Sequence, residues 1–546
     1  MRRPGSEALG WITTLLLAWV VAWPMLLLVG EAFGGPGGAA APVAEFMGTP
    51  TSWRALANSV WLSLASAAGA VAVGVPLAWL VARYALPGRR ALAWLLAMPV
   101  ALPPLVGVLA FLFLCGESGF LAHLVRAVLR LEEAPWRFQG WAAILLVHVY
   151  ATYPFVFLLA RAGLGTLDAA LLEAATGLGA GRARVARHVL LPALAPAIAG
   201  GGLLAFMTSL ASFSAPYLFG GGTRVLTTQI VSSRLNGDDA RAMVETLALA
   251  AVALTALGVF RVLDPPEARA ASGRATRPLP RRPAGPLLGA LAWTLALALV
   301  LPHLTLLLVS FVPRGTWTTE ALPPVLSAGN YLVLLRDPVR FRPMVNSLWM
   351  ATLATAGAVA LATLGGWLAL RRGVATRGVL TALLALPWAV PGTVFAVALA
   401  TAFAKDDPWT ARVVLIGTPW LLPLAWLVRD LPLTSRAVLA RFRRLDPALD
   451  EAAAALGAGP WRTLRRVTLP LLAPALMAGG ALAFVTAFGD FVTSIVLYSY
   501  ETRPVSLEIL ASLRQSDVGV AAAYGLVLTV VSAAVFALDR PPEEAP

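Results

Sequence analysis

Apolar runs of about 20 residues recur from one end of this chain to the other, and they restrict its fold more than any other feature. A helix of that length crosses the roughly 30 Å of hydrocarbon in a bilayer. The 546-residue chain is 59% hydrophobic and only 13% charged, whereas soluble domains are roughly 25% charged. Helices satisfy their own backbone hydrogen bonds in lipid. Alternating segments of about ten residues, typical of membrane β-barrels, are not seen. We therefore expect an all-α membrane protein.

The apolar runs predict about twelve transmembrane helices. We expect them at about residues 11–33, 57–82, 91–115, 141–160, 192–219, 242–262, 287–312, 346–370, 378–403, 411–428, 471–498 and 519–538. The first run also allows a cleaved signal peptide, with Arg2 and Arg3 before it and small residues after it. It is long for a signal peptide, which favours an uncleaved span.

One short polar segment occurs twice. Residues 173–192 read EAATGLGAGRARVARHVLLP, and residues 451–470 read EAAAALGAGPWRTLRRVTLP. Both contain Glu-Ala-Ala, a glycine six residues after the glutamate, and a terminal Leu-Pro. A polar segment between membrane spans must face water, where a soluble partner can bind it.

The duplication extends beyond this segment. Matched features include Asn58-Ser59 with Asn346-Ser347, Pro99 and Pro103 with Pro387 and Pro391, and Thr223-Arg224 with Thr502-Arg503. Each half has six predicted spans, so both halves share one orientation and are expected to be related by a pseudo-twofold axis along the membrane normal. We predict one domain at 1–263, a Pro- and Arg-rich linker at 264–286 and a second domain at 287–546. The prolines are expected to kink or break their helices, either as bundle curvature or as part of a gate.

The net charge of +14 fits membrane topology. Alternate assignment of the loops places the whole basic excess on the side that holds the N-terminus. Because Lys and Arg mark the cytoplasmic side, both termini and both repeated segments are predicted to be cytoplasmic. The excess therefore requires no nucleic-acid partner. The single cysteine, Cys115, excludes an intramolecular disulfide.

Each repeated segment predicts a helix, a glycine bend and a second basic helix. Asp168 and Asp446 lie where an acid favours a helix start, and Gly179 and Gly457 lie where glycine ends a helix. An amphipathic loop on lipid headgroups is the alternative reading, but two copies with the same internal spacing favour a binding site.

These segments resemble the EAA motif of binding-protein-dependent ABC importer permeases, with Val189 and Val467 where isoleucine is usual. The resemblance covers nearly the whole chain and implies the type I ABC importer permease fold. It implies that each segment is a coupling helix in a cleft of an ATPase subunit. The positions that carry this role are Glu173, Ala174, Ala175, Gly179, Leu191, Pro192, Glu451, Ala452, Ala453, Gly457, Leu469 and Pro470. Weaker candidates are Arg184, Arg187, Arg462 and Arg465.

No P-loop is present, since the only lysine is Lys405 and no glycine-rich loop precedes it. The chain is therefore predicted to be a transporter permease and no enzyme, binding no cofactor or metal itself. ATP and Mg are expected on a separate ATPase subunit, present in two copies. The other expected partners are an extracytoplasmic solute-binding protein and the lipid bilayer of a bacterial inner membrane. The four histidines have no metal-ligand spacing.

Polar residues after each repeated segment are candidates for the translocation pathway: Ser212, Ser214, Tyr217, Asp490, Thr493 and Ser494. Asp490 either lines the pathway or is buried and bonded to a neighbouring helix. An ion-coupled secondary transporter is the alternative of a different class. Such proteins use ionisable residues inside the membrane, and here only Asp490 is a clear example, with Glu245 near a span end.

Within the family, fused double permeases of this length resemble those that import ferric iron, with thiamine permeases next. The resemblance to the iron type lies in residues 211–230, 489–510 and 513–525. Polyamine, sulfate and phosphonate permeases share the motif and remain alternatives. Specificity in these systems resides largely in the external binding protein, and the resemblance implies transport by alternating access.

Overall fold

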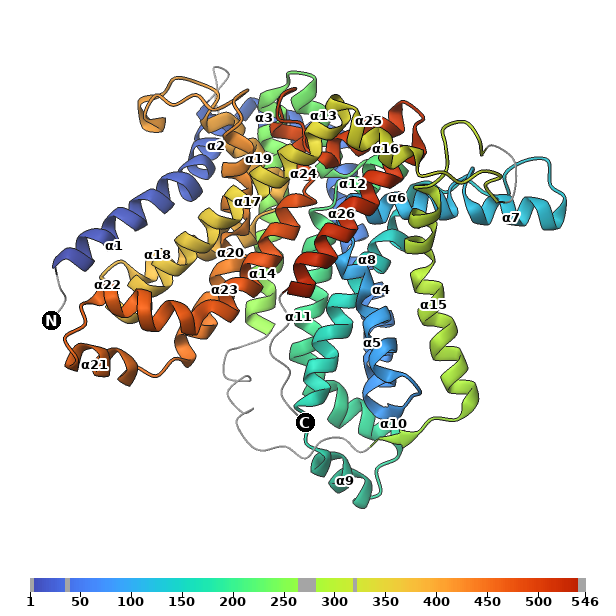
Figure 1. Ribbon diagram of the computed structural model, residues 1–546, viewed down its shortest axis with the longest axis horizontal. Coiled ribbons are helices and arrows are strands. Elements are labelled where there is room, and N and C mark those ends of the chain that lie inside the picture. The colour runs from blue at the N-terminus through green and yellow to red at the C-terminus, as the bar shows by residue number, and fades with distance from the viewer. Residues whose placement is uncertain (1–3, 35–39, 264–280, 318–321, 539–546) are drawn as a thin grey trace. The chain divides into compact units, whose positions relative to one another are not determined.

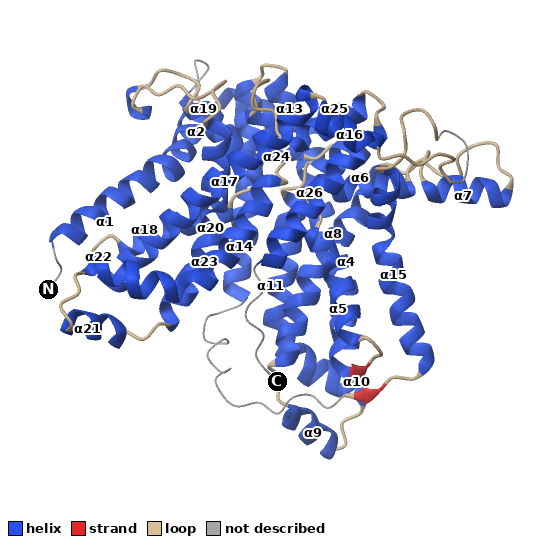
Figure 2. Ribbon diagram, viewed as in Figure 1, coloured by secondary structure: helices blue, strands red, loops and turns tan. Residues whose placement is uncertain are grey.

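The computed structural model describes residues 4–34, 40–263, 281–317 and 322–538 and is helical almost throughout (Figures 1 and 2). Within those ranges the only strands are β1 (Tyr84–Ala85) and β2 (Arg282–Pro283), which pair in parallel. Ten helices there are long and apolar enough to cross a membrane, or eleven if one bent pair counts as a span. The predicted all-α membrane fold is therefore confirmed.

The helices pack into two compact units. Unit 1 comprises residues 1–48, 230–250 and 328–546, and unit 2 comprises residues 49–229 and 251–327. Each unit takes its main bundle from one sequence half and its outermost helices from the other. The predicted boundaries at 263 and 287 follow the sequence repeat and stay a prediction; residues 264–280 of the linker and the tail after 538 lie outside the described residues.

Unit 1 consists of helices at the N-terminus and of those from the second half of the chain. They are α1 (Pro4–Leu17), α2 (Trp23–Gly34), α3 (Ala40–Gly48), α16 (Gly329–Arg336), α17 (Pro338–Gly366), α18 (Arg377–Ala385), α19 (Gly392–Ala402), α20 (Leu421–Arg444), α21 (Ala448–Ala455), α22 (Pro460–Thr463), α23 (Leu469–Phe488), α24 (Val492–Leu497), α25 (Val505–Arg514) and α26 (Val518–Leu538).

Unit 2 consists of helices from the first half and the first helix of the second half. They are α4 (Pro50–Arg83), α5 (Arg89–Ala97), α6 (Pro104–Cys115), α7 (Phe120–Leu129), α8 (Gly140–Gly165), α9 (Ala169–Gly177), α10 (Arg182–Val185), α11 (Leu191–Leu210), α12 (Ser214–Phe219) and α15 (Pro286–Val309). Two further helices, α13 (Leu226–Leu235) and α14 (Asp239–Leu263), have residues in both units.

The exchange of outer helices is fixed by polar contacts as well as apolar packing. In unit 1, the hydroxyl oxygens of Thr14 on α1 and of Thr376, just before α18, are hydrogen-bonded at 2.9 Å. In unit 2, the indole of Trp293 on α15 donates to the carbonyl of Pro87 at 3.0 Å. The first span of each sequence half therefore packs against helices encoded by the other half.

Glycines at equivalent positions bring the central helices of each bundle close together. A Cβ on Gly201 of α11 would lie 2.8 Å from Cα of Val156 on α8, and one on Gly479 of α23 would lie 3.2 Å from Cα of Thr434 on α20. A methyl group at Gly201 would require the facing backbone to shift, and one at Gly479 would require a displacement of a few tenths of an ångström. Close packing through small residues is the main attraction between membrane helices, because lipid removes the hydrophobic driving force.

The paired prolines break their helices, as the sequence predicts. Each first proline lies in a 3-10 turn, Met98–Ala101 or Leu386–Ala389, and each second proline precedes the next helix, α6 or α19. The break after Ala389 bends the chain by 112°. The span predicted at 411–428 is misplaced, because helix α20 begins at Leu421 and runs to Arg444. The adjacent ionisable residues Arg429 and Asp430 interrupt the apolar run, but the helix continues past them.

Candidate functional site

Both repeated segments begin with a helix capped by an aspartate. Asp168 accepts a hydrogen bond from the backbone N–H of Ala170 at 3.0 Å, at the start of α9. Asp446 accepts one from Ala448 at 2.9 Å, at the start of α21. An aspartate in this position satisfies a backbone donor that has no partner within the helix. The helix start predicted from the sequence is therefore confirmed in both copies.

Both helices end in the same glycine-dependent motif. The N–H of Ala180 donates to the carbonyl of Ala175 at 3.1 Å, and that of Gly179 donates to Thr176 at 3.0 Å. In the second copy Ala458 donates to Ala453, and Gly457 donates to Ala454, each at 2.9 Å. This is the Schellman motif, which requires a left-handed residue after the helix.

Gly179 and Gly457 supply that left-handed residue, with φ of +78° and +76°. An L-residue is strained in this conformation, whereas glycine is not. No atom lies within 4 Å of the Cβ that either glycine would carry. The left-handed backbone conformation, rather than a lack of space for a side chain, therefore accounts for glycine at this position in both copies.

A wide helical turn follows in each copy, just before the Leu-Pro pair. Residues Ala186–Leu190 and Leu464–Thr468 form π-helical turns, closed by the N–H groups of Leu191 and Leu469. The next residues, Pro192 and Pro470, open the membrane helices α11 and α23. Proline lacks an N–H and clashes with the carbonyl four residues earlier in a regular helix. A π turn at this point widens the helix ahead of the proline.

The outer face of each segment carries the same side chains. Glu173 and Glu451 are exposed. So are two leucines seven residues apart in each copy, Leu171 and Leu178 in one and Leu449 and Leu456 in the other. The leucine that ends each helix is 89% exposed in the first copy and 88% in the second. Sequence reasoning missed these leucines, although their equal offset from the Glu-Ala-Ala triplet marks them.

The other predicted positions of the segment lie at its surface or its base. The third residue of each triplet is less exposed than the second, and Ala453 is buried. All four of the weaker arginine candidates are exposed: Arg184, Arg187, Arg462 and Arg465. In unit 1 the segment is also tethered, because Arg371 contacts the carboxylate of Asp450 at 3.4 Å and donates to the carbonyl of Leu445 at 2.8 Å.

A second equivalent site surrounds the break between two helices in each unit. In unit 2, α11 and α12 are interrupted at residues 211–213, and Ser212 lies in the break. The buried ring of His148 on α8 reaches it, with Nε2 2.9 Å from Ser212 Oγ and Nδ1 2.7 Å from Ser209 Oγ. Ser66 Oγ of α4 lies 3.3 Å from the same Nδ1. One histidine thus joins three helices at the break.

In unit 1 the break separates α23 from α24, and Asp490 lies in it. The indole N–H of Trp426 on α20 donates to Oδ2 of Asp490 at 3.0 Å. Arg429 of the same helix forms an ion pair with Oδ1. The N–H groups of Thr493 and Ser494 each donate to Oδ2 at 3.1 Å. Asp490 therefore caps α24 and anchors it to α20.

The loops beyond both breaks are held alike. Thr227 donates to the carbonyl of Ser212 at 2.7 Å, and Ser506 donates to that of Asp490 at 2.6 Å. The repeated Asn-Ser pairs hold the same loops from another helix: Ser59 accepts from the N–H of Leu226 at 2.8 Å, and Ser347 accepts from that of Val505 at 2.9 Å. The Asn-Ser repeat therefore serves to fasten these loops.

The six predicted pathway residues lie at or just after the two breaks. Four are buried, namely Ser214, Asp490, Thr493 and Ser494, while Ser212 and Tyr217 are partly exposed. Their role in a pathway stays a prediction. Sequence reasoning missed Trp426 and Arg429 as partners of Asp490. Among the described residues, no group of three or more His, Cys, Asp or Glu side chains could hold a metal ion.

Comparison with known proteins gives the family. Residues 74–265 and 362–540 each match the family described as the binding-protein-dependent transport system inner membrane component. The chain is 30% identical to a probable ABC transporter permease protein, y4fN, of Sinorhizobium fredii, over 96% of this chain and 94% of the relative. It is 26% identical to the ferric transport system permease protein FbpB of Actinobacillus pleuropneumoniae, over 95% and 76%.

A third relative covers half of the chain. The thiamine transport system permease protein ThiP of Brucella suis is 30% identical over 51% of this chain and 50% of the relative. Two copies of the family domain, one in each half, agree with the duplication of the Glu-Ala-Ala segment and of the helix break. The chain therefore belongs to the binding-protein-dependent ABC transporter permeases, as a fused double permease with two family domains.

Proposed function

We propose that this permease imports ferric iron, and that two copies of a separate ATPase subunit drive it through the two Glu-Ala-Ala segments. A solute-binding protein delivers the ion to the outer face. ATP-driven closure of the ATPase pair moves the coupling helices α9 and α21, and alternating access releases the ion into the cytoplasm. ATP and Mg bind to the ATPase, and this chain binds no cofactor.

The two coupling segments carry this proposal. They share an aspartate cap, a Schellman ending with a left-handed glycine, and an exposed glutamate and leucine pair at equal offsets. A partner with two equal subunits needs two equal docking sites. An exposed leucine at the tip of a rigid helix end is well placed to fill an apolar pocket of such a partner, since buried side chains dominate interface energies.

The proposed orientation places both segments and both termini in the cytoplasm of a bacterium, with the chain in its inner membrane. The basic excess on that side supports this orientation. Lys405, the only lysine of the chain, lies in a loop after α19 and contacts Glu31 at 3.2 Å. In this orientation Lys405 is on the extracytoplasmic side, opposite the two coupling segments.

Ion-coupled transport is the alternative of a different class. The two acids that the sequence singles out for it have basic partners: Asp490 pairs with Arg429, and Glu245 pairs with Arg241 at 3.1 Å. Asp430 of α20 is also buried, and its carboxylate oxygens have no hydrogen-bond partner among the described residues. A carboxylate paired with arginine keeps its charge and is a poor proton carrier. Membership of the permease family favours the ATP-driven mechanism.

Coupling is tested by removing the two glutamates. Glu173→Ala/Glu451→Ala is expected to weaken co-purification of the ATPase subunit and to reduce uptake in proteoliposomes. Glu132→Ala/Glu133→Ala is a matched control, because it removes the same charge from exposed residues at the opposite end of unit 2. Full ATPase binding and full uptake by the first variant would refute the assignment.

Ferric iron is favoured over the other substrates because the similarity to the ferric permease spans 95% of the chain, whereas that to the thiamine permease spans 51%. Thiamine, polyamines, sulfate and phosphonates are the alternatives. The test is uptake into proteoliposomes with the cognate binding protein loaded with Fe³⁺ or with each competitor. Uptake of a competitor without uptake of iron would refute the substrate and leave the coupling assignment intact.

A further inference from the structure

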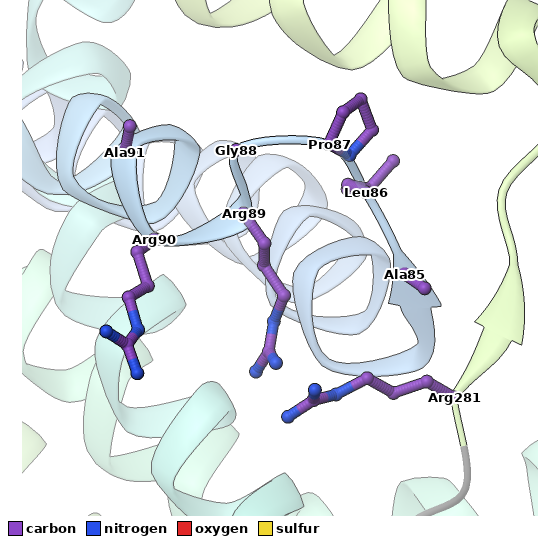
Figure 3. A pocket seen from close by; sticks show the side chains of 8 residues that line it. All are labelled: Ala85, Leu86, Pro87, Gly88, Arg89, Arg90, Ala91 and Arg281. Carbon is purple, nitrogen blue, oxygen red and sulfur yellow. The ribbon is translucent and has the colours of Figure 1, made fainter.

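A basic pocket lies at one end of unit 2, where α4 ends and α5 begins. It has a volume of about 710 Å³ and is lined by the turn at residues 85–88, by Arg89 and Arg90, and by Arg281 next to β2. Figure 3 shows Arg89 and Arg90 extending to one side of this turn and Arg281, just before β2, extending toward the end of Arg89. Helix α5 packs against α8, whose residue Arg161 lies near Arg89. Since α8 leads into α9, the pocket shares its end of unit 2 with the coupling segment.

The pocket concentrates positive charge without a carboxylate. No acidic residue lines it, and no described acid forms an ion pair with its three arginines. Burial and the positive charges of Arg281 and Arg161 lower the pKa of Arg89 below its ordinary value. Arg282 also lies close enough to Arg83 for the two guanidinium groups to repel one another. Like charges held together in this way favour a bound anion that offsets the repulsion.

The equivalent corner of unit 1 provides an internal comparison. There Arg371, which the repeat aligns with Arg83, contacts Asp450 and the carbonyl of Leu445. Glu7 of α1 accepts a hydrogen bond from the N–H of Ala375 at 3.1 Å in the same corner. The first sequence half has Leu172 where the second has Asp450. Acidic residues therefore offset the positive charge at this corner of unit 1, whereas the equivalent corner of unit 2 stays basic.

The pocket is held in place before any ligand binds. Strands β1 and β2 pair Tyr84 with Arg282 and Ala85 with Pro283, which fixes the residue after Arg281. Trp293 binds the carbonyl of Pro87, and Nε of Arg89 donates to the carbonyl of Val81 at 2.8 Å. A preorganised site loses less entropy when it binds a ligand.

Exposed apolar side chains on α5 and α15, the helices that follow the pocket residues in the chain, indicate the kind of anion. Trp94 lies one turn after Arg90 on α5 and is 79% exposed, and Leu287 at the start of α15 is 83% exposed. Exposed tryptophan beside arginine is typical of the membrane interface. A soluble phosphate needs no apolar surface, whereas a phospholipid places its acyl chains beside its headgroup.

We propose that this pocket binds the phosphate of an anionic phospholipid, with Arg89, Arg90 and Arg281 around the headgroup and Trp94 and Leu287 beside the acyl chains. Basic pockets between membrane helices on the cytoplasmic side bind such headgroups. The site goes beyond the proposed transport function, because it ties one corner of the permease, beside one coupling segment, to the lipid composition of the membrane.

The test measures lipid bound to the purified full chain by native mass spectrometry, with phosphatidylglycerol compared with phosphatidylcholine. Arg90→Gln/Arg281→Gln is the main variant, because it leaves in place Arg89, whose side chain donates to the carbonyl of Val81. Each basic side chain at an anionic surface contributes about a factor of five. The variant is therefore expected to bind phosphatidylglycerol about 30-fold more weakly, with phosphatidylcholine binding unchanged.

Arg54→Gln/Arg137→Gln is the matched control. It removes two exposed arginines of the same unit, next to the opposite ends of α4 and α8, and is expected to bind phosphatidylglycerol like the wild type. Equal loss in the control and the main variant would overturn the proposal, as would no loss in either.

Two further results would also overturn it. Displacement of the lipid by millimolar inorganic phosphate would assign the pocket to a soluble phosphate. Unchanged lipid binding together with weaker co-purification of the ATPase would assign the pocket to a protein contact.

Discussion

The left-handed glycine at the end of each coupling helix leads to a prediction with a defined magnitude. An alanine forced into the left-handed conformation costs about 1–2 kcal/mol. The Cβ added at Gly179 or Gly457 would meet no atom within 4 Å, so this cost is entirely conformational. It corresponds to a shift of about 5- to 30-fold in the population of the native helix ending.

The assay is the affinity of the purified ATPase subunit for the permease in nanodiscs. If the partner recognises the native helix ending, Gly179→Ala and Gly457→Ala are each expected to raise Kd by up to about 30-fold at the affected site. Asparagine tolerates the left-handed conformation. Gly179→Asn and Gly457→Asn are therefore expected to bind nearly as well as the wild type, although asparagine is the larger side chain.

The comparison of alanine with asparagine decides the reasoning. Wild-type affinity in both alanine variants would show that the Schellman ending is not needed for binding. If an asparagine variant bound the ATPase subunit as weakly as its alanine counterpart, side-chain volume at the interface, rather than backbone strain, would limit binding.

Three further predictions concern thermal unfolding of the purified chain. Asp490→Asn leaves the charge of Arg429 unpaired and is expected to destabilise by about 3 kcal/mol, with partial recovery in Asp490→Asn/Arg429→Gln; a double variant worse than the single one would contradict the ion-pair assignment. His148→Ala leaves the surrounding serine hydroxyls without their partner and is expected to cost about 1–3 kcal/mol; an unchanged Tm would show that this contact is not stabilising. Gly201→Ala is expected to lower Tm more than Gly479→Ala, because its added methyl lies 2.8 Å rather than 3.2 Å from the facing backbone; the reverse order would show that helix separation does not set the cost.

Local chemistry made several features predictable from the sequence. Proline lacks an N–H, and two prolines four residues apart favour a helix break at Pro103 and at Pro391. Single prolines such as Pro154 and Pro432 lie inside helices that continue past them. The glycine ending of the coupling helices follows in the same way, since few residues other than glycine adopt the required backbone conformation. These features depend on a few neighbouring residues and need no knowledge of the tertiary structure.

Features that depend on distant residues were not predictable in this way. Hydropathy ended the tenth span at residue 428, because two adjacent ionisable residues, Arg429 and Asp430, are typical of a loop. The structure shows that Arg429 pairs with Asp490, 61 residues later in the chain. Likewise, nothing in the sequence around Trp293 shows that α15 packs against the first half of the chain.

The exchange of outer helices affects the order in which this protein can fold. Helix α1 is synthesised more than 300 residues before its partner α18. At about 5–20 residues per second, it must wait roughly 20 to 70 s in the membrane before that partner emerges from the ribosome. The hydroxyl groups of α1 have hydrogen-bond acceptors during this delay. Thr13 donates to the carbonyl of Leu9 at 2.8 Å, and Thr14 donates to that of Gly10 at 2.7 Å, so each finds an acceptor within α1 itself. The hydrogen bond between the hydroxyls of Thr14 and Thr376 forms only after the second half is synthesised. Helix α1 can therefore stay in the bilayer as a separate helix before it packs into a bundle.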